Sequence, residues 1–320
     1  MTASNPFVVQ LADDLWQIDV RHQGQPGVIA SYLLTGPAGP ALVDVGPGAA
    51  MPRLLEGIRA VGVEPVAIEH LLLTHVHLDH AGATGALLRQ MPRARAYVHH
   101  IGARHLIHPE KLIASAERIY GDQMATLWGE ILPVPAERLV EIDEGTLLLA
   151  GSRELRALYT PGHAIHHAAF YDARHGEVFA GDVAGVRVPG GGTVRPPTPP
   201  PDLDLEAWEA SIARLEELAP HTVYLAHFGP VQDVGPHLEQ LRGRLRRWGQ
   251  LVLAGMRAGE PVEQIAARLA GDLDAAVAAL PPGEREEALG RVELASNHLM
   301  AAQGYVRYFT KRHPELLPAQ

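Results

Sequence analysis

Residues 75–80 read His-Val-His-Leu-Asp-His and are the most informative motif of this sequence. It follows an apolar run at residues 68–74, which predicts a buried β-strand. In extended backbone, side chains at positions i and i+2 point to the same side, so His75 and His77 can bind one cation together. Asp79 and His80 follow after the chain begins to turn and can reach a second position. Imidazole and carboxylate groups suit zinc, and also iron or manganese.

Three further candidate ligands lie far along the chain. His163, Asp182 and His227 each follow an apolar run that predicts a strand. In layered α/β folds, ligand sites collect at the ends of strands. A single polar residue in that position often has only a structural role, but three in the same relation to their strands indicate a shared site. The sequence therefore predicts that distant segments converge on one metal centre.

These residues resemble the motifs of the metallo-β-lactamase fold superfamily and, within it, of the glyoxalase II-like hydrolases. The resemblance runs from about residue 7 to about residue 232. Besides residues 75–80 it includes Thr-Pro-Gly-His at 160–163, Gly-Asp at 181–182 and Ala-His-Phe-Gly at 226–229. It implies an α+β fold, an αββα sandwich with the metals at one edge.

The resemblance also implies a division of the ligands between two divalent cations. Zinc is the preferred metal, with iron or manganese as alternatives. A water shared by the two cations has a lowered pKa, so that hydroxide is present at neutral pH to attack a carbonyl or phosphoryl centre. Asp79 is also the candidate catalytic residue, because it can orient this nucleophile or carry its proton. The implied ligands are His75, His77 and His163 for the first metal, Asp79, His80 and His227 for the second, and Asp182 as the bridge.

The candidate substrate-binding residues are His166, Arg187 and Arg195. Many relatives have a hydroxyl where this chain has Ala164, and a small residue where it has His166. His166 is therefore expected to narrow or polarise the substrate pocket. Arg187 and Arg195 lie in a stretch rich in Gly and Pro, residues 185–202. We favour an ordered loop over the metal site rather than a linker, because both ends leave near predicted ligands. Each arginine could then bind an anionic substrate group, or remain a solvated charge.

The composition restricts the class of protein. The chain has 320 residues, is 47% hydrophobic and 20% charged, and carries a formal charge of −10, which disfavours a broad basic surface for nucleic acid. The absence of cysteine excludes disulfides and thiolate ligands. No apolar stretch is long enough for a transmembrane helix, and the cytoplasm is the expected location. The length allows one large αβ domain plus a small appendage, and the change to helix-only character beyond Gly235-Pro236 predicts a catalytic domain at residues 1–235 and a helical domain at 236–320.

The C-terminal part of the sequence reads only as helices. They are expected over residues 237–257, 262–270, 272–280 and 284–312, separated by Gly- and Pro-containing breaks. Arginines at 242, 244, 246 and 247 raise a nucleic-acid hypothesis, but nearby glutamates favour a solvated or salt-bridged helix face. The resemblance leaves open that this end contacts substrate or the second subunit of a homodimer.

Other segments predict supporting elements. A bent strand or hairpin is expected over residues 7–20, and helices over 50–61 and 81–91. Asp44 either supports the metal loop or caps a turn. Residues 101–131 predict a helical insertion that forms a wall or cap over the active site. The histidines at 99, 100, 105 and 108 lack a clear paired spacing, and we assign no metal site to them from sequence.

The function expected from these features is metal-dependent hydrolysis of a small thioester, ester or lactone. A mononuclear-iron persulfide dioxygenase retains the same ligands and is one alternative. A phosphodiesterase or nuclease with a nucleic-acid-binding helical end is another, and a regulatory module is a third. A true β-lactamase is disfavoured, because such relatives generally lack a carboxylate at the position of Asp182.

Overall fold

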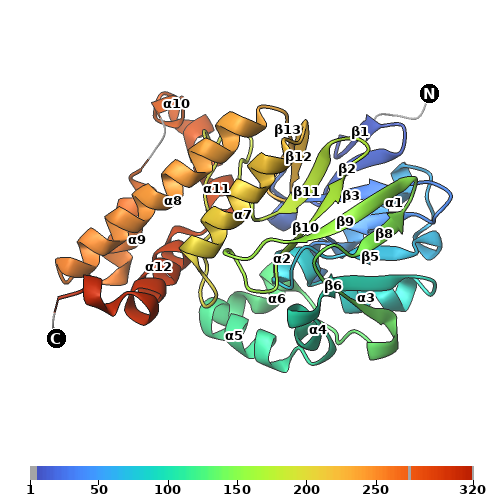
Figure 1. The fold of residues 1–320 in the computed structure, drawn as a ribbon, viewed down its shortest axis with the longest axis horizontal. Helices are drawn as coiled ribbons and strands as arrows, with labels where there is room; N and C mark the ends of the chain where they lie inside the picture. The colour runs from blue at the N-terminus through green and yellow to red at the C-terminus, as the bar shows by residue number, and fades with distance from the viewer. Residues whose placement is uncertain (1–5, 273–274, 319–320) are drawn as a thin grey trace. The chain divides into compact units, whose positions relative to one another are not determined.

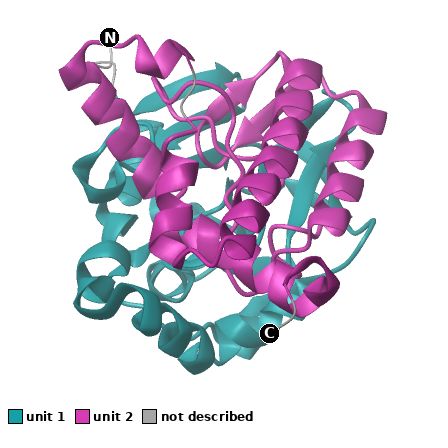
Figure 2. Ribbon diagram, turned by 90° about the vertical axis from the view of Figure 1, so that its left-hand side faces the viewer, with its two compact units in different colours: residues 1–159, 166–181 teal, residues 160–165, 182–320 magenta. Residues whose placement is uncertain are grey.

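The structure is a computed structural model that describes residues 6–272 and 275–318. Its contacts divide into two compact units (Figure 2). The first unit contains residues 1–159 and 166–181, and the second contains residues 160–165 and 182–320. The predicted domain boundary at 235/236 falls inside helix α8 (Val234–Arg257) and stays a prediction.

Among the described residues of the first unit, seven strands form one sheet in the order β1 to β7. Strands β1, β2, β3, β5 and β6 are labelled in Figure 1. Strands β1 to β4 pair antiparallel, and β4 to β7 pair parallel. The carboxyl ends of β4, β5, β6 and β7 therefore lie at one edge of the sheet. The strands are β1 Val8–Ala12, β2 Leu15–Asp19, β3 Ala30–Leu34, β4 Ala41–Val43, β5 His70–Leu72, β6 Arg95–His99 and β7 Leu139–Ile142.

The other strands of the first unit belong to a second sheet. They are β8 Leu147–Ala150, β9 Arg153–Tyr159, β10 Ala168–Asp172 and β11 Glu177–Gly181, each antiparallel to the next. Tyr32 in β3 and Phe179 in β11 meet edge to face, with ring centroids 5.5 Å apart. Both rings are buried, so this contact lies in the apolar layer between the two sheets.

Helices pack against the first sheet where small residues allow close approach. Helix α1 lies on β2, and a Cβ on Gly57 would stand 2.5 Å from Ile18 Cγ2. Helix α4 lies on β6 and β7. The predicted helix over 81–91 is two helices, and the first begins inside the metal motif, at Leu78. The helices of this unit are α1 Met51–Ala60, α2 Leu78–Ala81, α3 Thr84–Gln90, α4 His100–Ile107, α5 Glu110–Tyr120 and α6 Met124–Trp128.

The second unit combines one β-hairpin with helices. Helix α8 packs against α7, α9 and α12. Trp248 and Tyr305 are fully buried between them, and the Tyr305 hydroxyl donates a hydrogen bond to Leu245 O (2.8 Å). The elements are α7 Leu205–Leu218, β12 Thr222–Leu225, β13 Gly229–Val231, α8, α9 Val262–Ala270, α10 Ala275–Ala278, α11 Pro282–Ala295 and α12 His298–Arg312.

Two of the predicted C-terminal helices differ from the structure. The single helix expected over 284–312 is interrupted, because Asn297 caps a new helix by accepting a hydrogen bond from Met300 N (2.9 Å). Of the helix expected over 272–280, residues 273–274 lie outside the described residues, and α10 covers only 275–278. Two sheets and several helices, followed by C-terminal helices, confirm the predicted α+β fold class. No described helix is long and apolar enough to span a bilayer.

The segment 185–202 is an ordered part of the second unit. Val186 and Arg195 pair as an antiparallel bridge. The Thr198 carbonyl lies so close to α12 that a Cβ on Gly304 would stand 1.9 Å from its oxygen. Arg307 Nε and Arg244 Nη2 donate hydrogen bonds to Pro201 O (3.3 Å) and Thr193 Oγ1 (3.0 Å), respectively. The segment is therefore a loop held by the C-terminal helices, and its predicted position over the metal site stays a prediction.

Candidate metal centre

The first ligand set, defined as His75, His77, Asp79 and His80, lies at the carboxyl end of β5. His75 Nε2 and His77 Nδ1 are 2.9 Å apart. The rings of His75 and His80 are 4.0 Å apart between centroids, and both side chains are fully buried. His80 Nε2 lies 3.7 Å from Asp79 Oδ2. Within the first unit, the structure thus brings together all four residues of the motif.

Asp44 fixes the orientation of this set. It directly follows β4, has a left-handed φ of 52° and is buried. Its Oδ1 accepts a hydrogen bond from Thr74 N (2.8 Å), and its Oδ2 accepts one from His80 Nδ1 (2.8 Å). Because a carboxylate can only accept, His80 carries its proton on Nδ1 and directs the Nε2 lone pair away from Asp44. Of the two roles left open for Asp44, the structure favours support of the metal loop.

Thr74 fixes the orientation of the His75 ring in a similar way. Its hydroxyl donates to Asp44 Oδ2 (2.9 Å) and lies 3.1 Å from His75 Nδ1. With its only proton given to Asp44, the hydroxyl can only accept from His75 Nδ1–H. The Nε2 lone pair of His75 is then directed toward His77 Nδ1. Two imidazole nitrogens at 2.9 Å must share a proton or bind one cation.

The second ligand set, defined as His163, Asp182 and His227, lies within the second unit and is also buried. His163 Nε2 is 3.3 Å from Asp182 Oδ2, and His227 Nε2 is 3.6 Å from Asp182 Oδ1. The carboxylate therefore presents one oxygen to each imidazole. His163 Nδ1 donates to Pro197 O (2.7 Å), so its Nε2 lone pair is the one that faces the carboxylate.

Residues that the motifs do not contain hold the second ligand set in place. Trp208 Nε1 donates to Val183 O (2.7 Å), and His237 Nε2 donates to Ala184 O (2.8 Å). Burial lowers the pKa of His237, which keeps the ring neutral and consistent with this single donor role. The backbone carbonyls of Val183 and Ala184, which follow Asp182, thus each accept a hydrogen bond from a buried donor. Sequence reasoning missed Trp208 and His237, because nothing in their spacing marks them.

Gly162 explains how α7 approaches the second ligand set. Its φ is 132°, and a Cβ there would stand 2.3 Å from the Trp208 Cα. Any side chain would displace α7 from the segment that carries His163. The glycine of the Thr-Pro-Gly-His motif therefore serves packing rather than chemistry.

The candidate substrate-binding residues have different surroundings. The His166 ring lies parallel to that of His75, with centroids 6.1 Å apart, and is 5.6 Å from that of His77. Arg187 Nη1 makes an ion pair with Asp233 (2.9 Å) and remains about one-third exposed. Arg195 is buried, so it is not a solvated charge. A role in substrate binding stays a prediction for all three residues.

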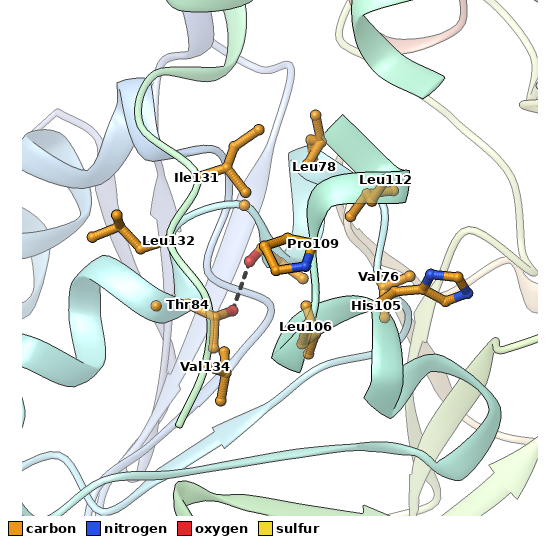
Figure 3. Close-up of a pocket in the computed structure, with 13 residues that line it drawn as sticks. Val76, Leu78, Thr84, His105, Leu106, Pro109, Leu112, Ile131, Leu132 and Val134 are labelled. Atoms are coloured by element: carbon orange, nitrogen blue, oxygen red, sulfur yellow. Dashed lines mark hydrogen bonds between the residues drawn. The ribbon is translucent and has the colours of Figure 1, made fainter. Parts of the chain in front are cut away.

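The helical insertion covers the metal loop, residues 73–80, on one side. A Cβ on Gly102 in α4 would stand 2.8 Å from Val76 Cγ1, which shows how close this helix lies. Figure 3 shows a small apolar pocket between the two, lined by Val76, Leu78, Leu106 and Leu112 among others. Burial and then the charge of Asp79 raise the pKa of Tyr120 in α5, so its phenol stays protonated. The predicted wall beside the first ligand set is therefore present in this unit.

Comparison with known proteins gives a family. The model of the metallo-β-lactamase superfamily matches residues 24–227. A hydroxyacylglutathione hydrolase of Synechococcus sp. is 32% identical over 151 residues, which are 47% of this chain and 47% of that protein. An atrochrysone carboxyl ACP thioesterase of Aspergillus fumigatus is 27% identical over 238 residues, which are 72% of this chain and 62% of that protein. The chain spans about half to two thirds of the length of the curated relatives it matches.

Solved structures confirm the fold. A metallo-β-lactamase family protein of Thermus thermophilus superposes with a TM-score of 0.67 at 24% identity, covering 88% of each chain. At this identity the likeness concerns the fold alone. Together with the family match over residues 24–227, it confirms the resemblance seen in the motifs. The chain belongs to the metallo-β-lactamase superfamily.

Proposed function

We propose that this protein is a hydrolase of small acyl thioesters, esters or lactones that uses two divalent cations. The first cation is held by His75, His77 and His163, and the second by Asp79, His80 and His227. Asp182 bridges the two. This division follows the family resemblance, and it requires that the two ligand sets face each other.

One observation carries the proposal: His163 Nε2 faces a carboxylate oxygen of Asp182, while the other ring nitrogen of His163 is engaged elsewhere. Its Nδ1–H is committed to Pro197 O, and its Nε2 lies 3.3 Å from a carboxylate oxygen. Two acceptors in a buried site repel each other unless a proton or a metal cation lies between them. The first ligand set repeats this arrangement, since His80 donates through Nδ1 to Asp44 while its Nε2 faces Asp79. Imidazoles and carboxylates in this proportion fit a zinc-type cation.

The connectivity of the chain supports the convergence of the two sets. Gly181 ends β11 in the first unit, where a Cβ would stand 2.6 Å from Thr74 Oγ1. Asp182 is the next residue, and Thr74 directly precedes His75. His166, whose ring stacks near that of His75, lies only three residues after His163. At the 165/166 and 181/182 crossings between the units, a few residues of chain therefore connect the second ligand set with residues beside the first.

The side chains then have distinct roles. A pair of divalent cations would supply hydroxide at neutral pH and polarise the substrate carbonyl. Asp79, whose side chain is one-quarter exposed, orients the nucleophilic water and receives its proton. Asp182 would contribute a carboxylate oxygen to each of the two cations. His166 lies beside the ligands His75 and His77, where it can donate a hydrogen bond to the substrate.

The substrate class rests on the relatives. The names of two of them specify cleavage of an acyl group from a sulfur carrier, in one case glutathione and in the other an acyl carrier protein. We therefore place thioesters first, followed by esters and lactones. Zinc is the preferred metal, with iron or manganese as alternatives. A single iron with oxygen uptake would instead fit the persulfide dioxygenase alternative.

The nucleic-acid alternative is disfavoured by the surroundings of the arginines in α8. Arg242 pairs with Glu216 (2.7 Å), Arg246 with Glu209 (2.7 Å) and Arg247 with Asp272 (2.6 Å). Arg244 donates to Thr193 Oγ1. Charges neutralised by neighbouring carboxylates contribute little to binding a polyanion. The helical face is salt-bridged, as the sequence indicated. A homodimer and a cytoplasmic location remain predictions.

The test is a panel assay of thioesters, lactones and phosphodiesters with metal-reconstituted protein. His77→Ala and Asp182→Ala each remove a proposed ligand and should lower both the metal content and kcat/KM. The loss of kcat/KM should exceed the loss of about 10–100-fold that is typical when a residue hydrogen-bonded to a metal ligand is replaced. His221→Ala changes an exposed histidine outside both sets and should retain full activity. Full turnover by a metal-depleted His77→Ala protein would contradict the proposal.

A further inference from the structure

A cluster outside both ligand sets lies at the carboxyl ends of the neighbouring parallel strands β6 and β7. Strand β6 ends at His99, and α4 begins at His100 (Figure 1). His99 is in register with Ile142, the last residue of β7, so that Asp143 follows directly beside it. Forty-three residues separate His100 from Asp143 in the sequence, so the histidines alone revealed no site.

The donor atoms of this cluster converge. One ligand atom from each of His99, His100 and Asp143 lies within 4.8 Å of the others. His100 Nδ1 contacts Asp143 Oδ1, and His99 Nε2 lies 3.9 Å from the same oxygen. The two imidazole rings are 4.5 Å apart at an angle of 34°. Small rotations of the exposed side chains are enough to place these atoms around one cation.

The fold holds the His99 side chain and the backbone of Asp143 in position. His99 is only 3% exposed, and its ring stacks on Tyr159 with centroids 4.4 Å apart and planes at 15°. Asp143 lies in a tight turn in which its N–H donates to Thr146 Oγ1 (3.0 Å) and its carbonyl accepts from Thr146 N (3.1 Å). This arrangement reduces the ordering that a cation would have to impose.

The open side of the cluster faces water. The His100 side chain is 48% exposed and that of Asp143 is 66% exposed. Glu144 follows Asp143 directly and adds a second carboxylate to the turn, which makes the local charge favourable for a cation. Three protein ligands with an accessible face leave room for water to complete a coordination shell.

We propose that His99, His100 and Asp143 form a separate binding site for a zinc-type divalent cation. Two imidazoles and one carboxylate are ligands that such cations prefer. The cation would join the ends of β6 and β7 and fix the start of α4. Binding through His99 Nε2 requires the ring proton to be on Nδ1. His99 Nδ1 then no longer accepts the long hydrogen bond from Ile101 N (3.4 Å). The alternative is a plain ion pair between His100 and Asp143.

The test compares zinc binding by the full-length protein and its variants. Metal-free protein is dialysed against micromolar Zn²⁺, and bound zinc is counted by elemental analysis. The double variant His100→Ala/Asp143→Asn removes two exposed ligands and should fold normally. His108→Ala, an exposed histidine directly after α4, is the matched control. Wild type and control should each bind one more Zn²⁺ per chain than the double variant.

A second readout separates this site from the proposed catalytic centre. The double variant should retain hydrolysis, while zinc added beyond the catalytic metals should raise the melting temperature of wild type but not of the double variant. Equal zinc stoichiometry and equal thermal shifts in all three proteins would overturn the proposal and leave the ion pair. His77→Ala tests the catalytic centre independently, because it removes none of these three residues.

Discussion

At the scale of single residues, Asp44 connects the end of β4 with the first ligand set. Its two oxygens accept hydrogen bonds from Thr74 N and His80 Nδ1. Only a carboxylate has two acceptor oxygens to satisfy both donors. In Asp44→Asn one of these donors meets an amide nitrogen, and the proton of His80 is no longer fixed on Nδ1. We expect zinc affinity to fall about 10–100-fold. Competition with a chromophoric chelator measures it, and Asp13→Asn at an exposed turn is the control. Equal affinities would show that Asp44 does not act through His80.

Asp14 makes stability depend on pH. The hydrogen bond from Arg153, whose side chain is 1% exposed, lowers the pKa of Asp14. A carboxyl group with a lowered folded-state pKa stabilises the fold above its unfolded pKa, and this contribution is lost as the pH falls through the folded value. Asp14→Asn should therefore be less stable than wild type at neutral pH, with a difference that shrinks below about pH 4. Urea unfolding at several pH values measures this, and a constant difference would contradict it.

The candidate ligands could be named from the sequence, but the residues that position them could not. Seven ligand types follow apolar runs in a recognisable order. In contrast, the orientation of the His163 ring is fixed by the backbone carbonyl of Pro197. Because every residue has a backbone carbonyl, no sequence motif marks this one. Trp208 and His237 act through ring N–H donors on helices that begin some distance along the chain. Only the folded backbone brings these donors to the residues that follow Asp182.

At the scale of elements, α12 supports the segment that contacts a ligand. Thr198 Oγ1 donates to Ala301 O (3.4 Å), and the neighbouring Pro197 carbonyl accepts from His163. Gly304 lets the segment cross the helix, because no side chain occupies the space next to Thr198 O. A helix near the C-terminus is thus mechanically linked to the second ligand set. The position of residues 185–202 between predicted ligands favoured an ordered loop, but did not indicate which helix would hold it.

The contact between α12 and residues 185–202 predicts that replacing two helical glycines by alanine changes the stability of the protein in opposite directions. Gly304→Ala places a Cβ 1.9 Å from a backbone oxygen and should cost about 1–3 kcal/mol of stability, with weaker zinc binding as His163 shifts. Gly290→Ala in α11 meets nothing within 4 Å and should gain about 0.5–1 kcal/mol from helix propensity. Denaturant unfolding and zinc titration of both variants measure the contrast. If Gly304→Ala were as stable and bound zinc as tightly as wild type, the link would be absent.

At the scale of the whole molecule, patterns of hydrophobicity predicted the class of fold more reliably than the limits of its elements. The apolar run before the metal motif is β5, and the expected hairpin over 7–20 is β1 and β2. The helix expected over 284–312 was wrong, because the apolar periodicity continues past Ser296 and hides the Asn297 cap. The site formed by His99, His100 and Asp143 was hidden for a different reason, since parallel pairing of β6 and β7 joins residues that are distant in sequence.

Anomalous diffraction from crystals of zinc-loaded protein can determine whether both ligand sets hold one pair of cations. We expect two anomalous peaks about 3.5–4 Å apart, with Asp182 between them and the six other ligands divided three and three. An electron-density map with no ion between His75 and His163, or a crystal structure in which the two ligand sets lie far apart, would contradict the proposed metal centre.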